Sequence, residues 1–137
     1  MTGPLTDPSR AALIHLLLPD LRRVLERDPA QAEEIFEELH GADAADLLLQ
    51  LGEESAQRLL QNIDPAEAAR ILEYVEGAAA ARLVEDLSDE HVADIVEEMD
   101  PDEGADLLSQ LEEEQQAEVL AAMEPDERED AAEILSH

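Results

Sequence analysis

A repeat of twelve residues dominates the sequence and restricts the folds that are open to it. From residue 28 to residue 135 the chain divides, without an insertion, into nine consecutive units of twelve residues, such as DPAEAARILEYV and SDEHVADIVEEM. A short fixed period is typical of repeat proteins, in which each unit packs mainly on its neighbours. We therefore expect a single repeat domain rather than several globular domains.

Apolar residues recur at fixed positions of the unit, which we number 1 to 12 from its first residue. Position 12 and positions 8 and 9 are apolar in all nine units, and position 5 is alanine in the first five. Positions 5, 8, 9 and 12 have the i, i+3, i+4, i+7 spacing of one helix face. Each unit is expected to form a helix of roughly eight to ten residues, too short to be stable alone.

The unit starts carry signals for the beginning of a helix. Asp-Pro pairs open three units, at residues 28, 64 and 100. Asp can cap a helix N-terminus, and Pro suits the first helical position. Asp64 with Glu67, and Asp100 with Glu103, have the spacing of a capping box.

These patterns predict an all-α protein, a superhelical α-solenoid of about ten short helices built on the 12-residue repeat. Residues 28–137 form the nine-unit repeat. Residues 1–27 are expected to form N-terminal capping helices of the same domain, divided near Pro19, that close one end of the stack.

Acidic pairs distinguish the last four units from the others. Positions 3, 7 and 10 should lie opposite the apolar stripe, where the core does not determine residue type. Position 7 is arginine in the three middle units and acidic in the other six. The last four units are acidic at position 3 as well, which gives four pairs at i, i+4 spacing: Glu90/Asp94, Asp102/Asp106, Glu114/Glu118 and Asp126/Asp130.

These pairs suggest a site for divalent cations. Residues 88–137 hold 19 acidic residues and one arginine. Mg²⁺ typically takes one or two carboxylates and keeps several waters, so one pair on a rigid helix supplies half a site. We predict the metal ligands Glu90, Asp94, Asp102 and Asp106, with a second surface completing the coordination. A solvated acidic face is the alternative interpretation.

The composition excludes several classes of partner. The formal net charge is -29, which disfavours nucleic acid and anionic membrane surfaces. The longest apolar run near the start, AALIHLLL, is too short to insert into a membrane. The chain has no cysteine, which excludes disulfides and thiolate metal sites. An acidic chain without lysine also fits adaptation to high salt.

No motif indicates catalysis or a known calcium loop. DPDEGAD lacks the glycine and glutamate positions of an EF-hand, and the chain has no glycine-rich phosphate loop. The four histidines are far apart in sequence, and His91 is expected to be an ordinary surface residue. We therefore predict that the protein is not an enzyme.

The repeat resembles a known family. DPAEAARILEYV, SDEHVADIVEEM and DPDEGADLLSQL, in tandem and followed by AAEILSH, are similar to the cytosolic N-terminal domain of MgtE-type magnesium transporters. The likeness covers about residues 15–137. In that family the domain is a superhelix of short helices that precedes a pair of CBS domains and a membrane channel, and the full-length protein is a homodimer.

The resemblance implies a gating mechanism on the cytoplasmic side of the cell membrane. Mg²⁺ between acidic faces of this domain and the CBS domains would favour the closed channel. The family's acidic pair falls on Glu90 and Asp94, whereas Arg58 stands where the family can use a further acid. Asp102 and Asp106 are an extrapolation from the charge pattern. The isolated domain is expected to bind Mg²⁺ weakly, with Ca²⁺ and Mn²⁺ as alternatives.

A second hypothesis belongs to a different class of function. Related short-helix repeats occur in flagellar motor switch proteins, which suggests an α-solenoid scaffold that binds other proteins. In that case the acidity would reflect salt adaptation, and the outward face would bind a basic partner. CBS-like sequence after residue 137 would favour the transporter hypothesis.

Overall fold

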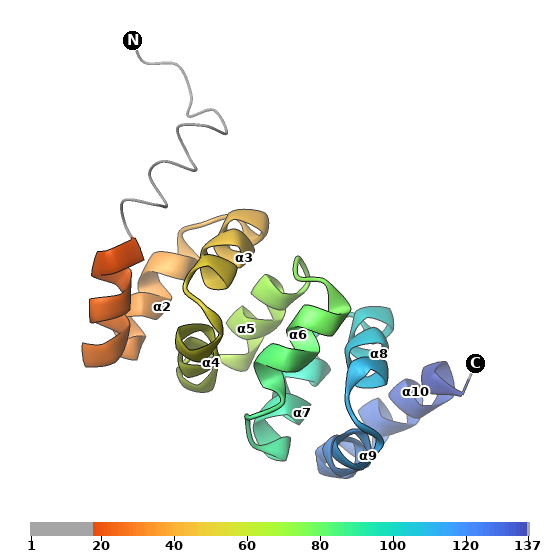
Figure 1. Ribbon diagram of the computed structural model, residues 1–137. Coiled ribbons are helices and arrows are strands. Elements are labelled where there is room, and N and C mark those ends of the chain that lie inside the picture. The colour runs from red at the N-terminus through yellow and green to blue at the C-terminus, as the bar shows by residue number, and fades with distance from the viewer. Residues whose placement is uncertain (1–17, 137) are drawn as a thin grey trace.

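The computed structural model describes residues 18–136, which are helical for most of their length and contain no strand. Residues 18–27 are helical and precede nine labelled helices (Figure 1). These are α2 (Pro29–Glu37), α3 (Gly41–Gln50), α4 (Glu53–Asn62), α5 (Pro65–Leu72), α6 (Gly77–Val84), α7 (Asp89–Glu98), α8 (Pro101–Gln110), α9 (Glu113–Ala122) and α10 (Pro125–Leu135).

Each twelve-residue unit forms one helix, which confirms the predicted all-α repeat. Every helix from α2 to α10 begins at position 2 of its unit, so position 1 is always the N-cap residue. The helix at residues 18–27 contains Pro19. The first of the two predicted capping helices lies outside the described residues.

The helices pack in two rows, because each helix mainly contacts the helix two places along the chain. One row contains α3, α5, α7 and α9, and the other contains α2, α4, α6, α8 and α10. In Figure 1 the helices follow one another along the molecule, from residues 18–27 at one end to α10 at the other. Such a stack packs each internal helix between two neighbours and so overcomes its low intrinsic stability.

The predicted core positions are buried. In the six units from α3 to α8, positions 5, 8, 9 and 12 are all buried, and the described residues include no buried polar or charged side chain. The packing is thinner in α9 and α10, each of which buries a single residue, Val119 and Ala131. Position 5 is Gln116 and Arg128 in these units, and a polar residue there cannot join the apolar core.

Only part of the predicted capping chemistry forms. The Asp64 carboxylate accepts a hydrogen bond from the Ala66 N–H at 3.0 Å, as an N-cap should. The predicted capping box between Asp64 and Glu67 does not form. Glu67 pairs with Arg70, and the Asp64 N–H donates to the Glu33 carboxylate at 3.0 Å instead. Asp100 occupies the N-cap position of α8 without a side-chain cap bond.

Candidate cation site

The four predicted ligands are all exposed, but they belong to different rows of helices. Glu90 and Asp94 lie on α7, whereas Asp102 and Asp106 lie on α8. The helices α7 and α8 contact each other, but among the described residues these four carboxylates do not gather into one cluster of possible metal ligands. Their role as metal ligands stays a prediction.

Asp102 and Asp106 border a cavity of about 310 Å³ between the end of α5, the start of α6, and α8. The cavity has an apolar floor and an acidic rim, which is the combination found where a charged group with an apolar stem binds. The floor contains Leu72, Val75, Ala80, Met99 and Leu107, and the rim carboxylates are Glu73, Asp102, Glu103 and Asp106.

Three carboxylates that the sequence analysis did not select gather beside this cavity. One oxygen from each of Glu73, Asp100 and Glu103 lies within 4.8 Å of the others, and all three residues are exposed. Partial burial, the charges of Glu73 and Asp100, and a hydrogen bond with Glu73 raise the pKa of Glu103. A donor set made only of oxygen suits hard cations such as Mg²⁺ or Ca²⁺.

In α8 and α10, position 7 lies near the start of the helix two units earlier. A Cβ on Gly77, the first residue of α6, would be 2.7 Å from the Asp106 carboxylate. Asp130 and Pro101, the first residue of α8, line one further cavity. A carboxylate near a helix N-terminus is favoured by the helix dipole, so part of the acidity at position 7 has a structural cause.

Glu118, also at position 7, is an exception to that favourable arrangement. It lies against Asp89 at the start of α7, and a hydrogen bond with Asp89, reinforced by the negative charge of Asp89, raises the pKa of Glu118. The row of odd-numbered helices thus holds a second pair of acids, on α7 and α9, that repel each other. No ion pair forms among the described residues from 88 to 136, so these charges have no counter-ion within that part of the chain.

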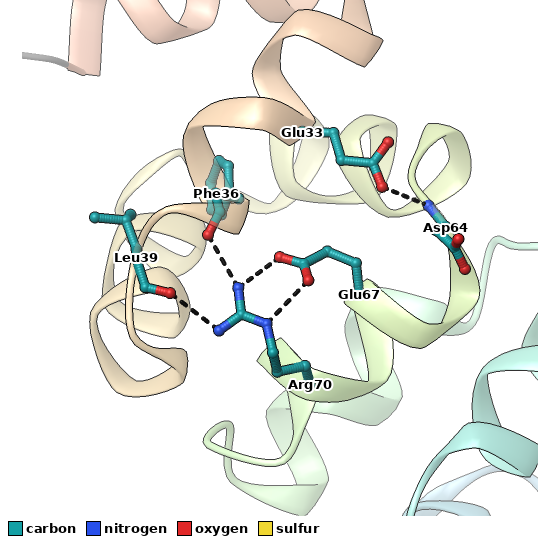
Figure 2. Close-up of polar contacts among 6 residues, drawn as sticks. All are labelled: Glu33, Phe36, Leu39, Asp64, Glu67 and Arg70. Atoms are coloured by element: carbon teal, nitrogen blue, oxygen red, sulfur yellow. Dashed lines mark hydrogen bonds and ion pairs between the residues drawn. The ribbon is translucent and has the colours of Figure 1, made fainter.

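Arg70, at position 7 of α5, makes four hydrogen bonds in a different kind of contact (Figure 2). Its Nε and Nη2 donate to the two carboxylate oxygens of Glu67 at 2.9 and 2.5 Å. Nη1 donates to the Leu39 carbonyl and Nη2 to the Phe36 carbonyl, both at 3.0 Å. The hydrogen bond with Glu67 raises the pKa of Arg70. We call this arrangement of Arg70, Glu67 and the two carbonyls the Arg70 socket.

The Arg70 socket gives position 7 a role that the sequence analysis did not identify. Arg70 lies outside the core, as expected for position 7, and it caps the C-terminal end of α2 by donating to the Phe36 and Leu39 carbonyls. The change from arginine to acid between the middle and last units therefore includes the loss of a structural contact.

Histidine 91 has a similar role on α7 and is not an ordinary surface residue. It is half-buried, and its Nε2 lies 2.8 Å from the Leu60 carbonyl at the end of α4. Gln115 on α9 donates to the Glu85 carbonyl, just after α6, at 3.1 Å. Side chains of α5, α7 and α9 thus each cap the helix three places earlier, a long-range contact that helix periodicity does not reveal.

Comparisons with known proteins identify the fold and a family. Residues 39–137 match the family described as the MgtE intracellular N domain. A comparison with curated proteins gave no match. A similar solved structure, described as the crystal structure of the soluble part of a magnesium transporter, is 23% identical with a TM-score of 0.74. The match covers 89% of this chain and 49% of that chain, so this chain spans about half the length of its solved neighbour. Among the described residues, no helix is long and apolar enough to cross a bilayer.

Proposed function

The chain belongs to the MgtE intracellular N-domain family, and from that premise we propose that it is the Mg²⁺-sensing regulatory domain of a magnesium transporter. In this proposal the domain lies on the cytoplasmic side of the cell membrane, and its partners are the CBS domains and the transmembrane channel of the same homodimeric protein. Catalysis forms no part of it.

One observation carries the proposal. The outward face of α7 presents Glu90 and Asp94 one helical turn apart, and no ion pair among the described residues from 88 to 136 neutralises them. Like charges at this spacing repel by about 0.2–0.5 kcal/mol per pair. A divalent cation shared with an acidic surface of a CBS domain would reverse that repulsion.

The proposed regulation follows from linkage. An ion that binds between two acidic surfaces binds the compact assembly more tightly than the separated one, and so increases the population of the compact, closed state. When Mg²⁺ is scarce, the unscreened carboxylates repel each other and the domain separates from its partner. Because this domain supplies only half of the ligands, it should bind Mg²⁺ weakly in isolation, and Ca²⁺ or Mn²⁺ could replace it.

The two predicted pairs have different places in the proposal. Glu90 and Asp94 form the primary half-site, on the row of odd-numbered helices. Asp102 and Asp106 form a second half-site on the even-numbered row, beside the carboxylates of Glu73 and Glu103.

We also propose that residues 1–27 close the N-terminal end of the stack, as part of the same domain. In the described part of this segment, Leu21 and Leu25 are buried in the common core. The Arg22 guanidinium donates to the Gln50 and Leu51 carbonyls at 3.1 and 3.3 Å. These contacts cover the end of α3 and support a capping role.

An amide-shift titration tests the Mg²⁺ proposal. The ¹⁵N-labelled chain is titrated with MgCl₂ and, separately, with NaCl at matched ionic strength. We expect saturable shifts around Glu90 and Asp94 with MgCl₂ that NaCl does not reproduce. The double variant Glu90→Gln/Asp94→Asn should lose them. The matched control Glu34→Gln/Asp46→Asn removes the same charge from position 7 of two N-terminal units and should keep them. Shifts that NaCl reproduces would contradict the proposal.

A further inference from the structure

The sequence has a second, longer period that relates the acidic cavity to the Arg70 socket. Asp-Pro pairs recur every 36 residues, at the starts of α2, α5 and α8. The packing of α8 on the end of α5 therefore repeats, three units later, the packing of α5 on the end of α2. The two helix ends also have the same backbone bond: Leu39 N–H donates to Phe36 at 3.1 Å, and Val75 N–H donates to Leu72 at 3.0 Å.

Adding 36 to each residue number of the Arg70 socket gives residues that line the cavity. The carbonyl-bearing Phe36 and Leu39 correspond to Leu72 and Val75, and Glu67 corresponds to Glu103. Glu37, whose charge also raises the pKa of Arg70, corresponds to Glu73. Gly41 corresponds to Gly77, and Arg70 itself corresponds to Asp106.

The cavity is thus the counterpart of the Arg70 socket without its arginine. No side chain of the described residues donates to the carbonyl of Leu72 or Val75, whereas the equivalent carbonyls each receive Arg70. Glu103, the counterpart of Glu67, lies against Glu73 and Asp100 instead of a guanidinium. The replacement of Arg70 by Asp106 also reverses the charge at the centre of the arrangement.

We propose that this cavity binds an arginine side chain presented by a partner protein, which occupies the place that Arg70 fills three units earlier. The four rim carboxylates supply charge complementarity, and the carbonyls of Leu72 and Val75 supply acceptors of the type that hold Arg70. A guanidinium donates five N–H groups in a plane and is weakly hydrated, which suits several acceptors around a confined space.

Asp102 and Asp106 also form the second half-site of the Mg²⁺ proposal, so an arginine and a hydrated Mg²⁺ would compete here, but only the arginine gains contact with the apolar floor. Leu72, Val75 and Leu107 offer no ligand atoms on their side chains, but they can cover the methylene stem of an arginine. The volume of about 310 Å³ is at the lower end of the range for ligand pockets, about 300–1,000 Å³, and suits one long side chain. This inference goes beyond Mg²⁺ sensing and does not depend on Glu90 or Asp94.

A short peptide tests the inference on the intact chain. The probe is acetyl-Ala-Arg-Ala-amide, with acetyl-Ala-citrulline-Ala-amide as a neutral control of nearly the same shape. A third peptide carries a guanidinium on one methylene and so has the charge without the stem. We expect saturable amide shifts at Gly77, Ala80 and Leu107 with the arginine peptide. Both control peptides should bind at least about tenfold more weakly.

Filling the cavity from within provides the decisive variant. Asp106→Arg introduces at this position the residue that its counterpart, Arg70, already is. The new guanidinium should pair with Glu103, which should raise the melting temperature and abolish binding of the arginine peptide. Asp46→Arg makes the same charge change at position 7 of α3, away from the cavity, and should keep peptide binding. Glu103→Gln removes the counterpart of Glu67 and should weaken binding severalfold even if Asp106→Arg fails to fold.

Three results would overturn the inference. The first is equal binding of the arginine peptide and its short-stemmed analogue. The second is retained binding by both Asp106→Arg and Glu103→Gln. The third is reproduction of the same shifts by NaCl alone at matched ionic strength. The Mg²⁺ proposal is monitored at amides of α7, so either idea can fail without the other.

Discussion

The Arg70 socket and the acidic cavity are built from equivalent parts of the repeat, yet they differ in what fills them. At the first, Arg70 on α5 binds Glu67 and two carbonyls at the end of α2. At the second, Asp106 replaces the arginine, and about 310 Å³ of space lies between α5, α6 and α8. The change from Arg70 to Asp106 reverses the charge at this position, and we propose that it turns an internal structural contact into a surface that receives a cation.

The same contrast extends over the two halves of the chain. Residues 1–87 contain seven of the eight arginines, whereas residues 88–137 contain one arginine and 19 acidic residues. In the first half arginines cap helix ends, as Arg22 and Arg70 do. In the second half acids from neighbouring helices face each other. We infer that the arginines of the first half offset part of its negative charge, whereas the second half depends on cations from outside.

The largest effect is expected from removing the internal arginine. Arg70→Met leaves Glu67 without its partner and removes the side-chain donor from the Phe36 and Leu39 carbonyls, so we expect the free energy of unfolding to fall by about 2 kcal/mol. That value allows for solvent screening, because the Arg70 side chain is 34% exposed. Urea unfolding monitored by circular dichroism measures it.

The matched control is Arg58→Met, an exposed arginine at the same position of α4 that forms no ion pair among the described residues. Its effect should stay within about 0.5 kcal/mol. Equal losses for the two variants would show that Arg70 contributes no more than an ordinary surface charge, and the contrast between socket and cavity would fail.

We expect an intermediate effect of pH on the stability of the fold, and this effect should arise from carboxylates of the acidic half. The folded pKa values of Glu103 and Glu118 lie above the ordinary glutamate value of 4.5, so the folded state binds these protons more tightly than the unfolded state. Their contribution to stability is complete below pH 4.5 and is lost as the pH rises through the raised folded values. Thermal melts across this range should show the decline.

Glu103→Gln isolates the contribution of the cavity to that pH dependence. The variant cannot carry the charge that Glu73 and Asp100 oppose, so it should be more stable than the natural chain at neutral pH and show a smaller decline with rising pH. An unchanged decline would mean that repulsion at the cavity does not affect stability.

The smallest effect on stability is expected at the proposed Mg²⁺ half-site. Glu90 and Asp94 are exposed and make no core contact, so Glu90→Gln/Asp94→Asn should change the free energy of unfolding by less than about 0.5 kcal/mol. Relief of the repulsion between them gives the change a stabilising sign. A large fall in melting temperature would place these residues in structural contacts and weaken their assignment to cation binding.

The helices and the core could be predicted from the sequence because both depend on local periodicity. The spacing of positions 5, 8, 9 and 12 determines one buried face per helix, and that face is buried from α3 to α8. The spacing gives no information on which helices become neighbours. The separation of Glu90 and Asp94 from Asp102 and Asp106 follows from the two rows, so it required the structure.

Tertiary contacts also determine which of two possible partners Glu67 pairs with, because both partners lie three residues away in the sequence. Glu67 lies three residues after Asp64, as in a capping box, and three residues before Arg70, as in a helical ion pair. The carbonyls at the end of α2 favour the second arrangement, because they hold Arg70 beside Glu67. One useful signal was present in the sequence: the Asp-Pro pairs recur every 36 residues and relate α8 to α5.

Hydrogen exchange resolved along the chain tests the central claim most directly. The protection of backbone amides is compared with and without millimolar MgCl₂, at constant ionic strength maintained with NaCl. If the acidic half requires external cations, protection should increase in α7 to α10 and stay unchanged in α2 to α5. Equal increases in both halves, or no change in α7 to α10, would contradict the account.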